Sequence, residues 1–346
     1  MLTCILLLVL LMGAPTPAQA LAEAGDNRPW MTITDAMGQE VRVRLPVRRL
    51  AINNGQVAEI LCALGVAEVI VGVSDHTLKH NAELLVDLQG KAAIGPSANP
   101  SLEKIVDLQP ELFIAYDIWL SAEQLEKKLT PLGIPVARLN AYRIDTIRRD
   151  IELLGRLVGK EQEARAYLQH FEAVLALTRE RLQGLTRPVR VYAEGYAQQS
   201  TFSRQAPNHE LFQMAGMENI AADLPVSNPR VAAEWVVEAN PEVIIKAATA
   251  SYVKMGFGAG DVAAVQRFHA CLRCRPAWEQ IAAVQNGRVY LIASELNSGP
   301  RLGIGLLYKA KWCHPDRFQD IDPEQVHRDW LRRWHQQELR GIYVYP

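Results

Sequence analysis

The stretch KEQEARAYLQHFEAVLALTRERLQGL at residues 160–185 has the pattern of one unbroken amphipathic helix, and it decides the fold that we predict. Its apolar residues recur at steps of 4, 3, 4 and 7, which places them on one helical face: Ala164, Leu168, Phe171, Leu175 and Leu182. Gly159 precedes the helix, and Gly184 and Pro188 end it. At about 1.5 Å per residue it would be roughly 39 Å long, about the width of a domain.

Short apolar strands alternate with helices on both sides of this helix. The strands predicted before it lie at residues 49–53, 69–73, 92–95, 111–116 and 136–139. The strands predicted after it lie at residues 188–194, 242–247 and 288–292. Alternation at such short intervals is typical of a parallel sheet with both faces covered by helices. We therefore predict an α/β fold of two Rossmann-like lobes with parallel sheets, joined by one long interlobe helix.

One segment occurs twice, once in each half of the chain. SLEKIVDLQPELFI at residues 101–114 aligns without a gap on AAEWVVEANPEVII at residues 232–245. Both copies have a Glu near the start and a Pro-Glu pair before an apolar strand, at a constant offset of 131 residues. A short helix, a proline that ends it and a buried strand therefore recur once per half, which favours two similar lobes.

These patterns predict the domain organisation. We expect an N-terminal α/β lobe at residues 30–158, a connecting helix at residues 159–186 and a C-terminal α/β lobe at residues 187–346. The second lobe ends in a helical tail that starts at Ser298 and is rich in aromatic residues. We expect the tail helices to pack on the second lobe.

The overall composition excludes one class of function. The hydrophobic content of 49% and the charged content of 22% are those of an ordinary globular protein. The formal net charge is −1, and no local block of Lys or Arg stands out. A nucleic-acid binder needs a basic face to neutralise phosphates, so we expect no nucleic-acid partner.

The N-terminus predicts an export signal. An apolar run at residues 5–12 is followed by Ala18-Gln19-Ala20, a small-x-small cleavage site. The run is too short to remain as a membrane span. We therefore expect residues 1–20 to be a signal peptide that is cleaved near Ala20, and the mature protein to be periplasmic or otherwise exported. A buried helix is the alternative reading of the apolar run.

Four cysteines remain after this cleavage site. Cys62 lies in an apolar helix and is predicted to be a core thiol, and Cys313 lies in the tail. Cys271 and Cys274 form a CxxC pair that could close a small disulfide ring in an oxidising compartment, although the sequence does not settle this. No second pair of Cys or His follows at zinc-site spacing, so the pair is weak evidence for a metal.

Several segments together resemble a known family. They are LCALGVAEVIVGV (61–73), IGPSANPSLEKIVDLQPELFIAY (94–116), MAGMENIA (214–221) and AEWVVEANPEVII (233–245). In this order and spacing they are similar to the periplasmic iron-siderophore and cobalamin binding proteins of ABC importers. The resemblance implies the class III architecture, in which two α/β lobes joined by one long helix bind a metal chelate in the cleft between them. It also implies that the stiff helix permits only small opening motions.

The resemblance further implies a membrane partner. In this family one surface Glu on each lobe docks onto arginines of the permease dimer in the inner membrane, and the matching positions are Glu103 and Glu234. Two carboxylates at the tips of two lobes can hold a symmetric dimer, and their charge steers the encounter. Glu in a first helical turn is also favoured by the helix dipole alone. Ser101 can cap the first of these helices, whereas Ala232 cannot cap the second.

Loops at the carboxyl ends of parallel strands are expected to hold the ligand. Asn54 lies in one such loop, and Tyr116 matches a position at which family members present an aromatic ring. Aromatic rings bury flat or macrocyclic chelates well. The candidate ligand contacts are Asn54, Tyr116, Trp119, Tyr196, Phe202, Arg204 and Arg301. The two arginines are candidates for binding carboxylates, propionates or phosphate, because a guanidinium binds such groups bidentately.

Three classes of function remain open at this stage. The first is a non-catalytic, monomeric binding protein that delivers an iron-siderophore, haem or corrinoid to an importer and has no resident cofactor. The second is a receptor for free zinc or manganese on a related fold, which would need several converging His and carboxylate ligands. The third is an exported α/β enzyme, but G-x-S-x-G, GxGxxG, H-E-x-x-H and P-loop motifs are all missing from the sequence. We therefore assign no catalytic residue and no metal ligand.

Overall fold

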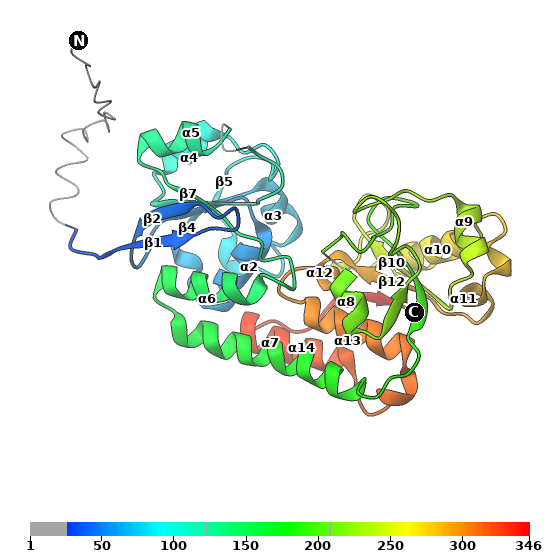
Figure 1. The fold of residues 1–346 in the computed structure, drawn as a ribbon. Coiled ribbons are helices and arrows are strands. Elements are labelled where there is room, and N and C mark those ends of the chain that lie inside the picture. Colours follow the sequence, from blue (N-terminus) through cyan, green and yellow to red (C-terminus); the bar gives the residue numbers. More distant parts are fainter. Residues whose placement is uncertain (1–25, 122–123, 208) are drawn as a thin grey trace, which may run out of the picture.

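The computed structural model describes residues 26–121, 124–207 and 209–346. The predicted signal peptide at residues 1–20 lies outside the described residues. Within the described part of the chain, no helix is both long enough and apolar enough to cross a membrane. The chain forms two lobes, each built around one five-stranded sheet (Figure 1).

The sheet of the first lobe is entirely parallel, with strand order β5-β4-β3-β6-β7. Its strands are β3 (Leu50–Ile52), β4 (Ile70–Val73), β5 (Ala92–Ala93), β6 (Leu112–Ala115) and β7 (Val136–Arg138). All residues of β3 and β6 are buried, as expected for central strands covered on both faces. An antiparallel hairpin of β1 (Trp30–Thr34) and β2 (Glu40–Arg44) precedes this sheet.

The sheet of the second lobe has the order β14-β12-β10-β8-β9. Its strands are β8 (Val189–Glu194), β9 (Met217–Asn219), β10 (Val243–Ala248), β12 (Val289–Ala293) and β14 (Val344–Tyr345). Four of them are parallel, and β14 pairs antiparallel with β12 at one edge. A small separate two-stranded sheet pairs β11 (Gly256–Phe257) antiparallel with β13 (Gly341–Ile342). The prediction of an α/β fold with parallel sheets in two lobes is therefore confirmed, with one antiparallel edge strand added.

Helices cover both sheets. Those of the first half are α2 (Gly55–Ala63), α3 (Asp75–His80), α4 (Leu102–Leu108), α5 (Glu126–Leu129), α6 (Ile147–Val158) and α7 (Glu161–Arg181). Those of the second half are α8 (His209–Met214), α9 (Ala233–Ala239), α10 (Val262–Arg273), α11 (Ala282–Gln285), α12 (Ser294–Asn297), α13 (Leu302–Cys313) and α14 (Pro323–His335). Short 3₁₀ turns lie at Ala67–Val69, Val86–Leu88, Thr130–Leu132, Trp278–Gln280 and Pro315–Arg317.

Helix α7 is the long helix that the sequence predicts, but it ends about one turn early. It has 21 residues, which corresponds to about 32 Å. After Arg181 the backbone tightens, because the N–H of Gln183 donates to the carbonyl of Glu180, and Gly184 then adopts a left-handed φ of 67°. The acidic residues of its first turn and the basic residues of its last turn both interact favourably with the helix dipole.

A close corner joins α6 to α7. Gly159 at the end of α6 has a φ of 69°, and the N–H of Lys160 donates to the carbonyl of Gly155 at 2.7 Å. A Cβ on Gly155 would lie 2.5 Å from the Cβ of Ala164. This corner therefore needs glycine at position 155, since any side chain there would push α7 away from α6.

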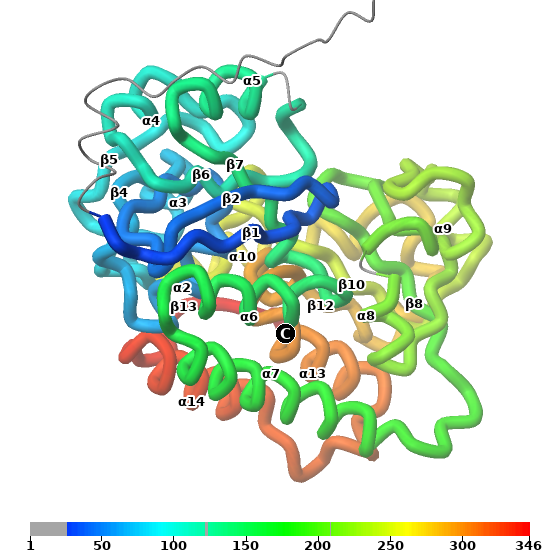
Figure 2. The backbone as a smooth tube through the Cα atoms, turned by 60° about the vertical axis from the view of Figure 1, so that its left-hand side comes forward, coloured from blue at the N-terminus to red at the C-terminus, as the bar shows by residue number. Residues whose placement is uncertain are grey.

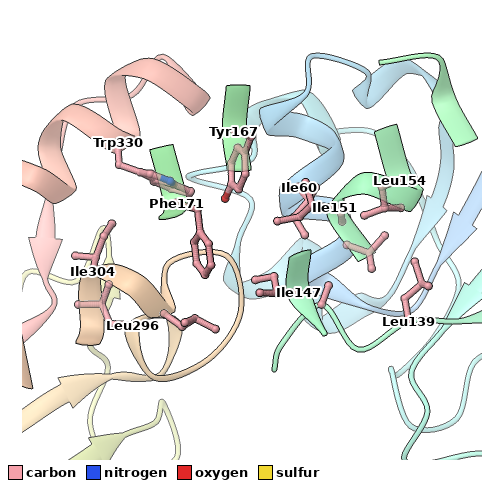
Figure 3. Packing of buried hydrophobic residues seen from close by; sticks show 14 of the residues in the cluster. Ile60, Leu139, Ile147, Ile151, Leu154, Tyr167, Phe171, Leu296, Ile304 and Trp330 are labelled. Atoms are coloured by element: carbon pink, nitrogen blue, oxygen red, sulfur yellow. The ribbon is translucent and has the colours of Figure 1, made fainter. Parts of the chain in front are cut away.

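The buried face of α7 is wider than the predicted stripe and faces both lobes. Its buried residues are Ala164, Tyr167, Leu168, Phe171, Val174 and Thr178. All of them except Thr178 belong to one hydrophobic cluster that extends from Ile60 of α2 in the first lobe to Ile304 of α13 in the second. Figure 3 shows Tyr167 and Phe171 of α7 in this cluster, with Trp330 and Ile304 on one side and Ile60 on the other. The lobes therefore share a continuous core beside α7.

A buried ion pair crosses the same junction. Glu59 of α2 and Arg301, just before α13, are 4% and 2% exposed. The Arg301 Nε donates to Glu59 Oε1 at 2.9 Å, and its Nη2 donates to Oε2 at 3.4 Å. Excluding water from two charges is costly, so the pair must be satisfied internally, and each charge requires the other lobe's partner.

The tail packs on the second lobe, as expected, but it also packs on the first lobe. Helix α14 contacts α13, but it also contacts α2 of the first lobe. Trp334 donates its indole N–H to His170 Nδ1 on α7 at 2.8 Å. In Figure 2, α14 lies beside α7 under the first lobe. The tail rings of Trp330 and Trp334 pack against Tyr167 of α7, with centroid distances of 6.1 and 4.8 Å. The tail therefore joins the two lobes.

We predict that breaking the Glu59–Arg301 pair destabilises the protein strongly. Glu59→Ala leaves a buried guanidinium without its carboxylate, which is expected to reduce the free energy of unfolding by about 3–5 kcal/mol. Urea unfolding followed by circular dichroism measures the change.

The matched control is Glu324→Ala. Glu324 forms an exposed pair with Arg328 within α14, at 2.7 Å. An exposed pair of this kind contributes about 0.3–0.5 kcal/mol. Similar losses in the two variants would show that the buried pair does not stabilise the junction.

Candidate ligand-binding site

Aromatic residues of both lobes lie just beyond the carboxyl ends of parallel strands. Tyr116 comes directly after β6, Tyr142 lies in the segment after β7, and Tyr196 follows β8. The two lobes meet here, because the N–H of Gly299 donates to the carbonyl of Tyr142 at 3.2 Å. Open α/β sheets bind ligands at this end of their strands. We refer to Tyr116, Trp119 and Tyr142 together with Tyr196 as the interlobe site.

The three aromatic rings of the first lobe form one cluster. The ring centroids of Tyr116 and Trp119 are 4.6 Å apart in an edge-on arrangement, and those of Tyr116 and Tyr142 are 6.0 Å apart. The Tyr142 hydroxyl donates to Asp117 Oδ1 at 2.9 Å. Trp119 is 46% exposed although it is a large apolar side chain. Tyr142 was not among the residues predicted from sequence, because nothing in its local sequence sets it apart.

The backbone and hydroxyl of Tyr116 are held by polar groups of the first lobe. Its hydroxyl donates to Gln56 Oε1, and its N–H donates to Asn53 Oδ1 at 3.1 Å. Its carbonyl accepts from Nη1 of Arg138 at 3.1 Å, and Arg138 is itself paired with Glu126 at 2.7 Å. The ring therefore has one defined orientation, which reduces the entropy lost when a ligand binds.

The interlobe site also includes an aromatic side chain from the second lobe. Tyr196 is 41% exposed. Burial raises the pKa of Tyr116 well above its ordinary value, and the phenol of Tyr196 adds to this shift by charge repulsion. Burial also raises the pKa of Tyr142, with Asp117 contributing in the same direction. The phenols of Tyr116 and Tyr142 are therefore neutral near neutral pH.

A polar cavity of about 240 Å³ lies between the lobes near this site. The first lobe contributes Arg143 and Asp145 to its lining, and the second lobe contributes Arg204 and His209. Arg143 pairs with Asp145 at 2.6 Å, and Arg204 pairs with Asp223. Arg204 is thus placed at the gap, as predicted, but it already has a carboxylate partner that a ligand group would have to replace.

The sequence matches the family described as periplasmic binding protein over residues 50–296. This match covers most of the chain and both sheets. The chain belongs to the periplasmic binding protein family. Among its relatives is the uncharacterized ABC transporter substrate-binding lipoprotein YvrC of Bacillus subtilis, 25% identical over 331 residues, which cover 90% of this chain and 95% of YvrC.

A second relative of this periplasmic binding protein has a named ligand. The vitamin B12-binding protein of Yersinia pestis is 27% identical over 197 residues, which cover 56% of this chain and 68% of that protein. Among solved structures, the molybdate-bound MolA of Haemophilus influenzae matches with a TM-score of 0.75 at 20% identity, covering 90% of this chain and 99% of MolA. At this identity the structural match shows the shared class III fold.

In this periplasmic binding protein, Arg301 does not face the gap between the lobes. Its side chain is 2% exposed and is bonded to Glu59, as described above. Arg301 lies in a Gly- and Pro-rich segment that looks like an exposed loop in the sequence, but the tail covers it. Its guanidinium lies 5.9 Å from the ring centroids of both Trp330 and Tyr343. The structure therefore gives Arg301 a role at the lobe junction in place of the predicted ligand contact.

Two other predicted contacts are also buried. Asn54 is 0% exposed and caps α2, because its Oδ1 accepts from the N–H groups of Gln56 and Val57 at 3.1 and 3.2 Å. Phe202 is 9% exposed, and its ring packs against Phe212 with a centroid distance of 5.9 Å. Each of them supports an aromatic residue of the interlobe site indirectly. Asn54 caps the helix that contains Gln56, the partner of the Tyr116 hydroxyl. Phe202 lies against Gly195, next to Tyr196.

Glu103 and Glu234 are exposed in the first turns of α4 and α9. The two copies of the predicted repeat also share a backbone conformation. Each helix ends in a residue with left-handed φ, which is 45° at Gln109 and 44° at Asn240. Ser101 caps α4 by accepting from the N–H of Lys104 at 3.3 Å, whereas Ala232 provides no side-chain cap for α9. Helix α9 nevertheless starts at the matching position, so tertiary packing replaces the missing cap.

The four described cysteines are free, and the described residues show no cluster of metal ligands. Cys62 and Cys313 are buried and Cys271 and Cys274 are exposed, and all four are free thiols in the structure. Burial raises the pKa of Cys62 to about 12. Across residues 26–121, 124–207 and 209–346, no three His, Cys, Asp or Glu side chains are grouped so that they could hold a metal ion.

We predict that Asn54→Ala reduces stability more than the removal of an exposed cap. The variant loses the cap of α2 and also leaves the buried carbonyl of Leu139 without its donor, now 3.0 Å from Nδ2. The expected loss in the free energy of unfolding is about 2 kcal/mol. Ser101→Ala, which removes the cap of α4 near solvent, should lose about 1 kcal/mol or less. Urea unfolding of both variants measures the difference, and a larger loss for Ser101→Ala would contradict the structural role of Asn54.

Proposed function

We propose that this protein captures a metal chelate, such as a corrinoid, haem or an iron-siderophore, between its two lobes and delivers it to the permease of an ABC importer. It acts as an exported binding protein in this role, in keeping with the substrate-binding family to which it belongs. Its chemistry is reversible binding, and no residue is assigned a catalytic role.

The observation that carries this proposal is the set of exposed aromatic rings at the gap between the lobes. Trp119 and Tyr196 are 46% and 41% exposed, and they come from different lobes. Isolated exposed rings are common on protein surfaces, but exposed rings that follow strands in both lobes offer apolar faces to a large flat ligand. A small oxyanion such as the molybdate of MolA would not need these rings. A chelate with a broad apolar face would bury them.

Two further observations support the same ligand class. The arginines that line the interlobe cavity lie beside carboxylates, so the rim of the site offers both donors and acceptors. Carboxylate, amide and phosphate groups around a chelate need both kinds of partner. The relative with a named ligand binds vitamin B12, which is a cobalt chelate with a macrocyclic ring.

We also propose that Glu103 and Glu234 dock on the permease. Both are exposed, and α4 and α9 lie at the ends of the two lobes away from α7 (Figure 1). Their equivalent places in the two copies of the repeat suit a partner with twofold symmetry. Exposed carboxylates of this kind contribute mainly to the rate and orientation of the encounter.

We expect one chelate to quench the fluorescence of Trp119 on binding. The purified protein is titrated with cyanocobalamin, haemin, a ferric catecholate siderophore and, as a naked ion, zinc chloride. A saturable decrease in fluorescence with one chelate is expected. Tyr116→Ala should make the binding free energy of that chelate less favourable by about 1–3 kcal/mol, because the ring is removed from the contact.

Two controls make this titration specific. Trp30→Phe removes an exposed indole of the β1–β2 hairpin that stacks between Arg42 and Arg44, and it should leave the quenching unchanged. Trp119→Phe should remove most of it. If no chelate changes the fluorescence while zinc binds tightly, the protein is a free-ion receptor and the proposal is wrong.

We expect the variant Glu103→Ala with Glu234→Ala to bind the chelate normally but to abolish uptake. The substitutions remove two exposed carboxylates and leave the interlobe site intact. Uptake is measured with labelled chelate in cells that carry the importer, and affinity is measured in vitro. The control pair is Glu161→Ala with Glu324→Ala, which are also exposed first-turn residues but lie on α7 and α14. Transport retained by the Glu103/Glu234 variant would refute the docking role.

A further inference from the structure

A buried lysine lies directly beneath the loop that carries Tyr196. Lys246 belongs to β10 and its side chain is 0% exposed. Its Nζ donates to three successive backbone carbonyls, those of Gly195 at 2.5 Å, Tyr196 at 3.2 Å and Ala197 at 3.2 Å. The loop after β8 is therefore wrapped around one ammonium group.

One carboxylate compensates this ammonium group, and a second cation shares that carboxylate. Lys246 Nζ lies 3.2 Å from Glu194 Oε1, and Glu194 also has a fully buried side chain. Arg275 contacts the same carboxylate with both terminal nitrogens, at 2.5 and 2.9 Å. The guanidinium of Arg275 lies 4.6 Å from the ring centroid of Trp278. The cluster is fixed from three elements, so Lys246 has little freedom to move.

A cluster of this kind is expensive for the fold to maintain. An apolar residue at position 246 would match the other positions of β10, which are all buried. Burying an ammonium ion requires full compensation by carbonyls and counter-ions. A pair of buried charges adds little to stability by itself. The presence of the Lys246–Glu194 pair is better explained by the backbone that Lys246 orients. What it orients is the backbone on both sides of Tyr196.

We propose that Lys246 is a positioning residue for the interlobe site, which acts by holding the carbonyls of residues 195–197 so that the Tyr196 ring faces the first lobe. This inference rests on the proposed function for its ligand readout. Lys246 does not touch the ligand in this account. Its effect on binding passes through Tyr196.

The first test compares two buried lysines of the second lobe. In Lys246→Met, affinity for the tightest-binding chelate of the panel is expected to fall about tenfold, since the loop carbonyls lose the ammonium group that donates to them. Lys309 of α13 is the matched control: it is 1% exposed, and its Nζ has no hydrogen-bond partner among the residues that the structure describes. Lys309→Met is expected to leave the affinity unchanged. Equal effects of the two substitutions on affinity would overturn the proposal.

A double-mutant cycle with Tyr196→Ala tests whether the effect passes through that ring. Tyr196→Ala is expected to weaken binding about tenfold in the wild-type background and less than about threefold in the Lys246→Met background. A lysine that merely stabilises the lobe would give additive effects on binding. Additive effects would therefore refute the positioning role even if Lys246→Met binds less tightly.

Hydrogen exchange on the ligand-free protein gives an answer that does not depend on the ligand. The N–H of Gly195 donates to the carbonyl of Ser200 at 2.7 Å, and this amide reports on the loop. In Lys246→Met, exchange is expected to rise at residues 195–200 and to stay low in β10. Faster exchange throughout the second lobe, or no change in the loop, would overturn the proposal. If no chelate binds the wild-type protein but the loop loosens as expected, the proposed function fails and the role of Lys246 in holding the loop stands.

Discussion

The structure depends on a buried junction at which the two lobes share one core. Glu59 of the first lobe and Arg301 of the second compensate each other's charge out of reach of water. Around them, Tyr167 of α7 and Trp330 of α14 fill the space between the lobes, with ring centroids 6.1 Å apart. A relative movement of the lobes at this point would have to separate a buried ion pair or open a cavity, and both cost several kcal/mol. Opening is therefore expected to be small and to occur at the other side of the lobes.

This constraint explains why the interlobe site can be built from two lobes and still be well ordered. Tyr116 is held by Asn53, Gln56 and Arg138 within the first lobe. Tyr196 is held through Lys246 within the second. Because the junction sets the distance between the lobes, both rings stay near the position that a ligand requires. A site preorganised in this way loses little entropy when a ligand binds.

The sequence predicted the architecture well because its signals were periodic and repeated. The apolar steps of α7 and the two copies of the helix-proline-strand segment carry long-range information in local patterns. The site was predicted less well. The rule that ligand contacts follow strands selected Tyr116, Trp119 and Tyr196. The same rule also selected Asn54, which is a buried helix cap. Likewise, the sequence could not show that the loop of Arg301 is covered by the tail. Those distinctions depend on which distant segments pack over a residue, and the contact of α14 with the first lobe could not be predicted for the same reason. Tyr142 and Lys246 carry no local signal at all, since each acquires its role from strands far apart in the sequence.

The most direct test of the account is a crystal structure of the protein with the chelate that binds it most tightly. The account predicts density for one chelate between the lobes, in contact with the rings of Tyr116 and Trp119 on one side and Tyr196 on the other, with the Glu59–Arg301 pair intact. A chelate bound to a single lobe, or in the separate cavity lined by Arg28 and Glu111 near the start of β6, would contradict it.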